Sequence, residues 1–229
     1  MEGTYITAMR TGAAGGVAAK YLARKDAKTV GIFGTGVQAR TQLWAVNEVR
    51  DLEKVYAFDI SANQSRKFAE DMSKVVGVEI ETANSPEIVV EKSEIIVTAT
   101  TSRTPVFDGR LLKQGTHINA VGSFRPDARE LDDDTVLRSK VVVDSREAAL
   151  AEAGDIVIPL KDRVINKTHI YAEIGEIITG KKHGRINDDE ITLFKSVGLG
   201  VQDAAAAHLA YKKAKEAGVG FEAELFEKA

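Results

Sequence analysis

A glycine-rich turn, GTGVQA at residues 34–39, is the first feature of this 229-residue sequence that could do chemistry. It follows the apolar run KTVGIF and precedes a helical pattern that begins near residue 37. Glycines at 34 and 36 let the backbone approach a pyrophosphate, which the N–H groups and positive dipole end of a helix attract. Ala39 stands where such turns usually carry a third glycine. Glycine corners also arise for steric reasons, so the turn alone is a weak signal.

A carboxylate at Asp59 strengthens the nucleotide interpretation. Asp59 ends the strand-like segment KVYAFD, twenty residues after Ala39, where an acid would accept hydrogen bonds from an adenosine ribose. The alternative is a solvated acid at the end of a strand. A carboxylate here repels a 2′-phosphate, which favours NAD over NADP, although the nearby Arg66 could accommodate that phosphate. We therefore expect NAD as the cofactor.

Alternating strand-like and helix-like segments must position these groups. Short apolar runs typical of buried strands lie at 28–34, 54–59, 78–83, 94–100, 116–122 and 140–145. Helical patterns at 37–50 and 63–76 separate the first three of them. Buried strands linked by helices predict a mostly parallel sheet covered on both faces. Right-handed crossovers then favour a doubly wound, Rossmann-type α/β fold.

Helices are also predicted on both sides of this core. Residues 5–24 predict a helix rich in small residues, which suggests close packing. Its apolar face is formed by Met9, Ala13, Val17 and Tyr21, with Ala14, Ala18 and Leu22 beside them. Later segments predict a helix at 171–180, a strand at 190–198 and an alanine-rich helix at 201–217. No linker or repeat interrupts the sequence, so we expect one domain over residues 1–229 with its core at about 28–199.

Small polar residues follow several of the predicted strands. They are TATTS at 98–102, NAVGS at 119–123 and KSVG at 195–198. Ligands of doubly wound sheets lie across the carboxyl ends of the strands, and small residues there let a flat cofactor lie against the backbone. Each segment alone could be an ordinary loop, but together they favour a cofactor site.

The composition excludes several other classes of function. The 31 basic and 34 acidic residues give a net charge of −3, and no basic stretch with aromatic residues is present, so we expect no nucleic-acid binding. The absence of cysteine excludes disulfides and thiolate nucleophiles, and we expect no metal site. No signal-peptide pattern or apolar run of ~18 residues occurs, which predicts a cytoplasmic protein without membrane contact.

Several longer stretches resemble the ornithine cyclodeaminase/mu-crystallin family. They are TAMRTGAAGGVAAKYLAR (7–24), GTGVQA (34–39), HINAVGSFRPDARELDDD (117–134), VVVDSREAALAEAGDI (141–156), AEIGEIITG (172–180) and FKSVGLGVQDAAAA (194–207). RTGAAGG and SVGLGVQD are far more specific than the glycine turn. The resemblance implies an NAD(P)-dependent protein related to archaeal-type alanine dehydrogenases, ketimine reductases and ornithine cyclodeaminases.

The resemblance also implies roles for single residues. The cofactor-binding residues would be Gly34, Thr35, Gly36, Val37, Gln38, Asp59, Thr100, Val121, Gly122, Ser123, Phe124 and Ser196. Among them, Val37 and Gln38 would contact the phosphates, Asp59 the ribose, and Thr100 with Val121–Phe124 would lie beneath the nicotinamide half. Val197 would lie on the substrate side. Arg10 matches an arginine that in relatives lies at both the cofactor and the substrate carboxylate, and binding a carboxylate suits the planar fork of a guanidinium.

One departure from the family concerns the reaction. Ornithine cyclodeaminases carry an aspartate at the position of Phe124 that acts on the substrate amine, and an aromatic ring cannot exchange a proton. We therefore expect hydride transfer between NAD(H) and a small L-amino acid or 2-imino acid, as in alanine dehydrogenases, rather than ornithine cyclisation. The charged stretch with Arg125, Asp127 and Glu130 is interpreted as a structural turn and helix start.

A second departure concerns the N-terminal side. Family members carry a segment before the RTGAA helix that builds much of the substrate pocket and the dimer interface. This sequence starts shortly before that helix, so we expect a fragment or minimal form, or a separate chain that supplies the missing half. The alternative function is then a nucleotide-binding module without turnover. The uncovered faces of helices 5–24 and 201–217 predict self-association as a homo-oligomer.

Overall fold

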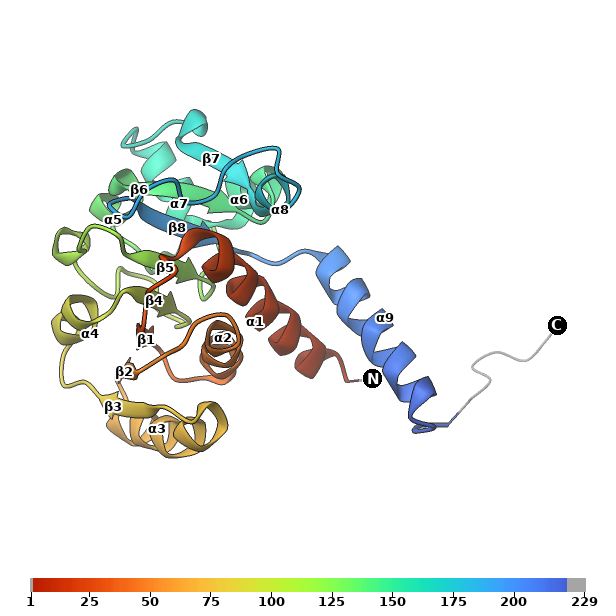
Figure 1. The fold of residues 1–229 in the computed structure, drawn as a ribbon. Coiled ribbons are helices and arrows are strands. Elements are labelled where there is room, and N and C mark those ends of the chain that lie inside the picture. The colour runs from red at the N-terminus through yellow and green to blue at the C-terminus, as the bar shows by residue number, and fades with distance from the viewer. Residues whose placement is uncertain (1, 222–229) are drawn as a thin grey trace.

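The computed structural model describes residues 2–221 and contains one sheet of eight strands (Figure 1). The strands lie in the order β3-β2-β1-β4-β5-β8-β6-β7, and each neighbouring pair is parallel. Their bounds are β1 Thr29–Phe33, β2 Lys54–Phe58, β3 Glu79–Thr82, β4 Ile95–Thr98, β5 His117–Ala120, β6 Ser139–Val143, β7 Ile170–Glu173 and β8 Ile191–Lys195. The predicted doubly wound, parallel α/β sheet is confirmed.

Helices cover both faces of the sheet. One face packs against α1 Gly3–Leu22, α2 Val37–Asn47, α3 Ala62–Val76 and α8 Ile174–Ile178. The other face packs against α4 Pro86–Lys92, α5 Asp133–Arg138, α6 Arg146–Glu152 and α7 Gly154–Lys161. The strands between them are almost continuously buried, as in β4 and β5, which explains why their sequences read as uninterrupted apolar runs.

The apolar face predicted for the first helix is only partly correct, because Ala18 and Leu22 are buried but none of Met9, Ala13, Val17 and Tyr21 is. Ala13 and Tyr21 are exposed, whereas the buried side of α1 consists of Ala8, Thr11, Gly12, Gly15, Gly16, Ala18, Ala19 and Leu22. A Cβ at Gly12 would lie 2.6 Å from the carbonyl oxygen of Thr41, and one at Gly16 would lie 2.8 Å from that of Ala45. The backbones of α1 and α2 are therefore in close contact. Only small residues fit between them, so the side of α1 that is buried is the one that carries glycine, alanine and threonine.

The predicted helix at 171–180 is only partly correct. Residues 170–173 form the edge strand β7, which pairs with β6, and the helix α8 begins at Ile174. Burial alternates along this strand, with Ile170 and Ala172 inward. In the sequence, four residues are too few for the alternation typical of a strand to be distinguished from the helical pattern that follows. The carboxylate of Glu176 accepts a hydrogen bond from the N–H of Glu173, which marks the change from strand to helix.

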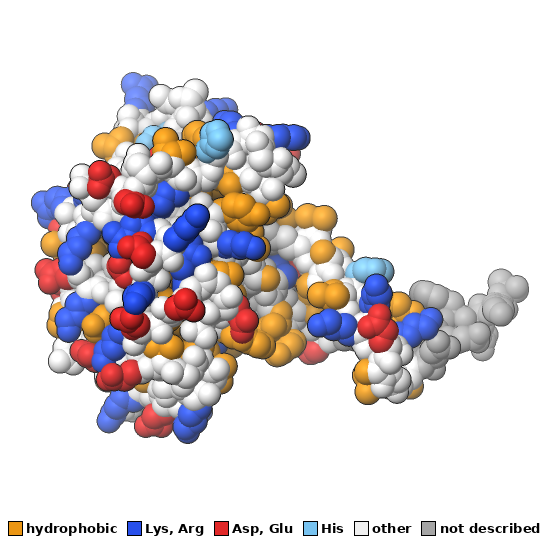
Figure 2. All heavy atoms as spheres, in the orientation of Figure 1, with side chains coloured by type: hydrophobic (Ala, Val, Ile, Leu, Met, Phe, Trp, Pro, Cys, Tyr) orange, Lys and Arg blue, Asp and Glu red, His pale blue; other side chains and the backbone are white. Residues whose placement is uncertain are grey.

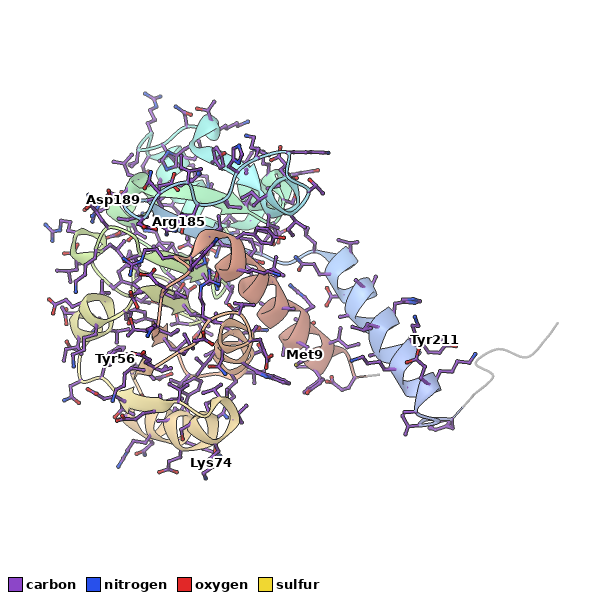
Figure 3. All side chains as sticks on the ribbon, viewed as in Figure 1. Met9, Tyr56, Lys74, Arg185, Asp189 and Tyr211 are labelled. Atoms are coloured by element: carbon purple, nitrogen blue, oxygen red, sulfur yellow. The ribbon has the colours of Figure 1, made fainter. Side chains whose placement is uncertain are left out.

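A chain of buried polar groups joins α1 to the centre of the sheet. His117 lies between the hydroxyl of Thr192 (2.9 Å) and the side-chain oxygen of Asn119 (3.0 Å). The amide of Asn119 donates to the carbonyl oxygen of Gly15 on α1 at 3.0 Å. At the C-terminal end of α1, Arg185 donates to the carbonyl oxygen of Leu22 at 2.6 Å. Figure 3 labels Arg185. These bonds fix the position of α1 against the strands.

The last helix, α9 (Gly200–Glu216), lies beside α1 and projects away from the sheet (Figure 1). It has no buried residue, and Val201, Leu209 and Tyr211 are 70%, 54% and 55% exposed. Met9 on α1 and Tyr211 on α9 mark this region in Figure 3. Within residues 2–221, none of the helices has the length and apolar character that crossing a membrane requires.

Candidate functional site

A cleft runs along the carboxyl ends of β1, β4, β5 and β8. It consists of two adjoining hollows of about 620 and 480 Å³ that share Gly36, Ala99, Thr100 and Thr101. The first hollow lies between the ends of β1, β2 and β4, where the order of the strands reverses. The second continues past β5 and β8 to α1. Together they extend along the carboxyl ends of the strands, where doubly wound sheets bind their ligands.

The glycine turn at the centre of this cleft is built for close approach. Gly34 has φ +80°, and a Cβ there would lie 2.7 Å from the carbonyl oxygen of Ala99, so only glycine fits. Gly36 lies before the first turn of α2, and a Cβ on it would meet no atom within 4 Å. Within residues 2–221 no side chain caps this end of α2, so its first N–H groups remain available to an anion.

Asp59 lines the first hollow and also braces the turn. Its carboxylate accepts hydrogen bonds from the N–H and the hydroxyl of Thr35, at 2.9 and 2.8 Å, and from the N–H of Ser61 at 2.9 Å. Each carboxylate oxygen has more than one acceptor site, so Asp59 keeps capacity for a ribose hydroxyl. Arg66 donates to Asn63 on the surface and does not line the cleft.

The structure brings nearly all the predicted site residues into this cleft. The first hollow is lined by Gly34, Thr35, Gly36, Asp59 and Thr100. The second is lined by Arg10, Gly36, Val37, Gln38, Thr100, Val121, Gly122, Phe124, Ser196 and Val197. Ser123 is the exception, because it is buried behind this surface and its hydroxyl donates to the carbonyl oxygen of Ala128. The ring of Phe124 is 63% exposed at the rim.

A buried carboxylate, Glu130, holds two of the strand ends that form the cleft. One oxygen accepts from the N–H of Thr100 at 2.6 Å, and the other accepts from the N–H of Gly122 at 2.9 Å and of Ser123 at 3.2 Å. Burial raises the pKa of Glu130, while the charge of Lys195 opposes that rise. Because its partners here are donors, Glu130 is best accommodated as the anion. The sequence interpretation placed Glu130 only in a structural turn.

Lys195 supplies the positive charge beside Glu130. Its ammonium group is fully buried, forms an ion pair with Asp155 at 2.8 Å and donates to the carbonyl oxygen of Ser123. Asp155 in turn accepts from the N–H groups of Glu130 and Leu131 at 2.7 and 2.9 Å. The sequence analysis did not predict this network. A lysine directly after the run ITLF is the signal that could have revealed it, since a buried lysine needs an acidic partner.

A second buried acid, Asp144, holds the loop after β8. One of its oxygens accepts from the hydroxyl of Ser196 at 2.9 Å and from the N–H groups of Val197 and Gly198 at 2.9 and 2.7 Å. The hydroxyl of Ser196 is thereby turned toward Asp144. The sequence reasoning did not single out Asp144, although it follows the β6 run VVV at the same edge of the sheet.

Arg10 lines the second hollow, with 14% of its side chain exposed. Gly198 lies directly beside it with φ +90°, and a Cβ there would be 2.3 Å from Nη1 of Arg10. Among the described residues that line this hollow, Arg10 is the one with an ionisable side chain. The second hollow therefore favours a ligand that carries a carboxylate.

These features fit a nicotinamide dinucleotide. The first hollow offers a carboxylate for the ribose, the turn offers backbone N–H groups for the pyrophosphate, and the second hollow offers a floor of small residues for a flat ring. Gly36 lies where the two hollows meet, and a Cβ added to it would point into open space.

Comparisons with known proteins agree with this geometry. The model of the ornithine cyclodeaminase/mu-crystallin family matches residues 1–218, which confirms the resemblance. The Δ1-pyrroline-2-carboxylate reductase of Bacillus cereus is 47% identical over 221 residues, which are 96% of this chain and 68% of that protein.

Two solved structures of relatives superpose closely. That of Thermococcus litoralis Δ1-pyrroline-2-carboxylate reductase in complex with NADH and L-proline has a TM-score of 0.96 and 60% identity, over 97% of this chain and 69% of that one. An archaeal alanine dehydrogenase dimer with bound NAD has a TM-score of 0.93 and 40% identity, over 99% of this chain and 69% of that one.

Proposed function

Because the chain belongs to the ornithine cyclodeaminase/mu-crystallin family, we propose that it is an NAD-dependent oxidoreductase that reduces a small imino acid. The first candidate substrate is Δ1-pyrroline-2-carboxylate, on which the Bacillus and Thermococcus relatives act by name. The observation that carries the proposal is the second hollow, in which Arg10, the one ionisable group among the described residues that line it, shares one surface with Gly36, Val37 and Gln38 of the glycine turn.

In the proposed reaction, NADH supplies a hydride to the carbon of the C=N bond, and the nitrogen takes up one proton. NADH becomes NAD+ and the imino acid becomes L-proline. The chain binds and orients both partners: the N–H groups of α2 hold the pyrophosphate, and Arg10 binds the carboxylate next to the reacting carbon. Glu130 and Asp144 keep the backbone of the floor in place from behind.

Asp59 supports the choice of NAD. Its carboxylate is already close to the turn that would hold the pyrophosphate, so a 2′-phosphate at the neighbouring ribose would meet a negative charge. Phe124 at the rim supports reduction over ornithine cyclisation, because its ring has no proton to exchange.

Reductive amination of pyruvate to alanine is the second candidate. The observation that favours it is the similarity to the archaeal alanine dehydrogenase over 99% of this chain. Both candidates share the hydride step and the carboxylate contact, and they differ in whether the imine is cyclic. A binding module without turnover remains the alternative from another class of function.

We propose further that the chain works as a homo-oligomer. Apolar side chains gather between the body and α9 (Figure 2), and Tyr5 on α1 and Val201 on α9 are 65% and 70% exposed. The archaeal alanine dehydrogenase relative is a dimer. Size-exclusion chromatography with light scattering should show a dimer or larger species, and a monomer at high concentration would contradict this part of the proposal.

The experiment that tests the function is a comparison of substrates with the purified 229-residue chain. Loss of NADH absorbance is followed with Δ1-pyrroline-2-carboxylate and, separately, with pyruvate and ammonium. We expect turnover with the cyclic imine and a higher KM in Arg10→Ala. Turnover only with pyruvate would favour the second candidate, and NADH binding without turnover on either substrate would favour the binding module.

A further inference from the structure

The helix α9 is bonded to Arg10, a residue that lines the cleft. Within residues 2–221, the side-chain hydrogen bonds that join α9 to another element involve only Thr7 and Arg10 of α1. Asp203 accepts from the hydroxyl of Thr7 at 3.3 Å and from Nε of Arg10 at 3.2 Å. Gln202 accepts from Nη1 of Arg10 at 3.2 Å. A helix that buries no residue is thus bonded to Arg10, which lines the second hollow.

These contacts define the orientation of the guanidinium. Asp203 holds the Nε edge, Gln202 holds Nη1, and Gly198 leaves the space in which the group lies. A guanidinium has five N–H donors, and these two bonds use two of them, so three remain. Three donors, including both on Nη2, are enough to bind a carboxylate through two parallel bonds.

We propose that Asp203 and Gln202 are positioning residues, which hold Arg10 in the orientation that binds the substrate carboxylate. This inference rests on the proposed function, because it assumes that Arg10 contacts the substrate. An arginine side chain has many rotamers, and one that is already fixed loses less freedom when the carboxylate arrives. Substrate affinity then depends on α9, although α9 itself does not line the cleft.

Electrostatics offers a competing interpretation with the opposite sign. The carboxylate of Asp203 is 36% exposed and pairs with Arg10, so it could compete with the substrate carboxylate for the same positive charge. In that case, removal of Asp203 would strengthen substrate binding. We favour positioning because Asp203 occupies the Nε edge and leaves both N–H groups of Nη2 unused.

The test compares four single variants: Asp203→Ala, Asp203→Asn, Gln202→Ala and Glu216→Ala. Glu216 is an exposed acid on the same helix and serves as the control for charge and helix stability. For each variant, KM and kcat are measured with Δ1-pyrroline-2-carboxylate, and NADH affinity is measured by fluorescence. Binding of L-proline to the NADH complex, followed by the same fluorescence, supplies a readout that needs no turnover.

We expect Asp203→Ala to raise KM and the dissociation constant of L-proline about tenfold, with kcat and NADH affinity nearly unchanged. Asp203→Asn keeps an acceptor for Nε, so its effect should be smaller, and Glu216→Ala should behave as the wild type. In the Arg10→Ala background, Asp203→Ala should have little further effect, because its partner is already gone.

Three outcomes would overturn the inference. If Arg10→Ala raises KM but Asp203→Ala and Gln202→Ala do not, Arg10 binds the substrate without their help. A lower KM in Asp203→Ala would show competition instead of positioning. If wild-type protein binds NADH but neither turns over nor binds L-proline, the proposed function itself fails and the inference fails with it.

Discussion

His117 is expected to make the protein less stable in acid. It is fully buried on β5 between Thr192 and Asn119, in the polar chain that joins the sheet to α1. Burial, helped by the positive charges of Arg185 and Arg50, lowers the pKa of His117 from its ordinary 6.5 to about 3. The folded protein therefore keeps this imidazole neutral where an unfolded chain would protonate it.

The size of the effect follows from this difference in pKa. Well above pH 6.5 the imidazole of His117 is neutral in both the folded and the unfolded state, and its contribution to stability is fully present. As the pH falls from 6.5 toward 3, only the unfolded state gains the proton, and each pH unit costs about 1.4 kcal/mol of unfolding free energy. Between about pH 7.5 and 4.5 this group should therefore remove about 2.7 kcal/mol.

Urea unfolding of the wild type and of His117→Gln at those two pH values measures the effect. Glutamine keeps one donor and one acceptor at this position but does not titrate. All other titrating groups are common to the two proteins, so the difference between their pH-dependent losses isolates His117. The wild type should lose about 2.7 kcal/mol more than the variant, which is a midpoint shift of roughly 1 M urea. Equal losses would refute the account of a buried neutral His117.

Three further substitutions test the cleft. Gly34→Ala should weaken NADH binding and lower the free energy of unfolding by about 1–2 kcal/mol, because φ at this residue is +80° and a Cβ would clash with Ala99. An unchanged dissociation constant in NADH fluorescence titrations would contradict this. Asp59→Ala should narrow the preference for NADH over NADPH in steady-state assays, and an unchanged ratio of kcat/KM would show that Asp59 does not read the ribose. Glu130→Gln should lower kcat/KM at least tenfold and lower the free energy of unfolding in urea by about 1–3 kcal/mol. The reason is that an amide cannot accept from all the N–H groups of Thr100, Gly122 and Ser123. Wild-type values in both assays would refute this role.

Much of the fold could be predicted because its signals are local. An apolar strand, a glycine turn and a helix follow one another at residues 28–50, and each leaves a pattern within a few residues. The same holds for most residues that line the cleft, since they lie directly after the strands β1, β2, β4, β5 and β8. Arg10, on α1, was predicted from the family resemblance instead. The strand β7 was not predicted, because its four residues directly precede a helix and the two segments gave one helical pattern in the sequence.

The groups behind the cleft could not be predicted in the same way. Glu130 contacts Thr100 across 30 positions of sequence, and Asp144 contacts Val197 across 53. Such contacts depend on which strands become neighbours in the sheet, and β8 lies between β5 and β6 although it comes last among the strands. The buried side of α1 was predicted only in part for a related reason, because this helix packs against the backbone of α2.

A crystal structure of this chain with NADH and L-proline tests the central claim most directly. We expect the pyrophosphate at the N-terminus of α2, the nicotinamide against Val121 and Gly122, and the carboxylate of proline on Arg10. NADH bound outside this cleft, or a proline carboxylate that makes no contact with Arg10, would contradict the account.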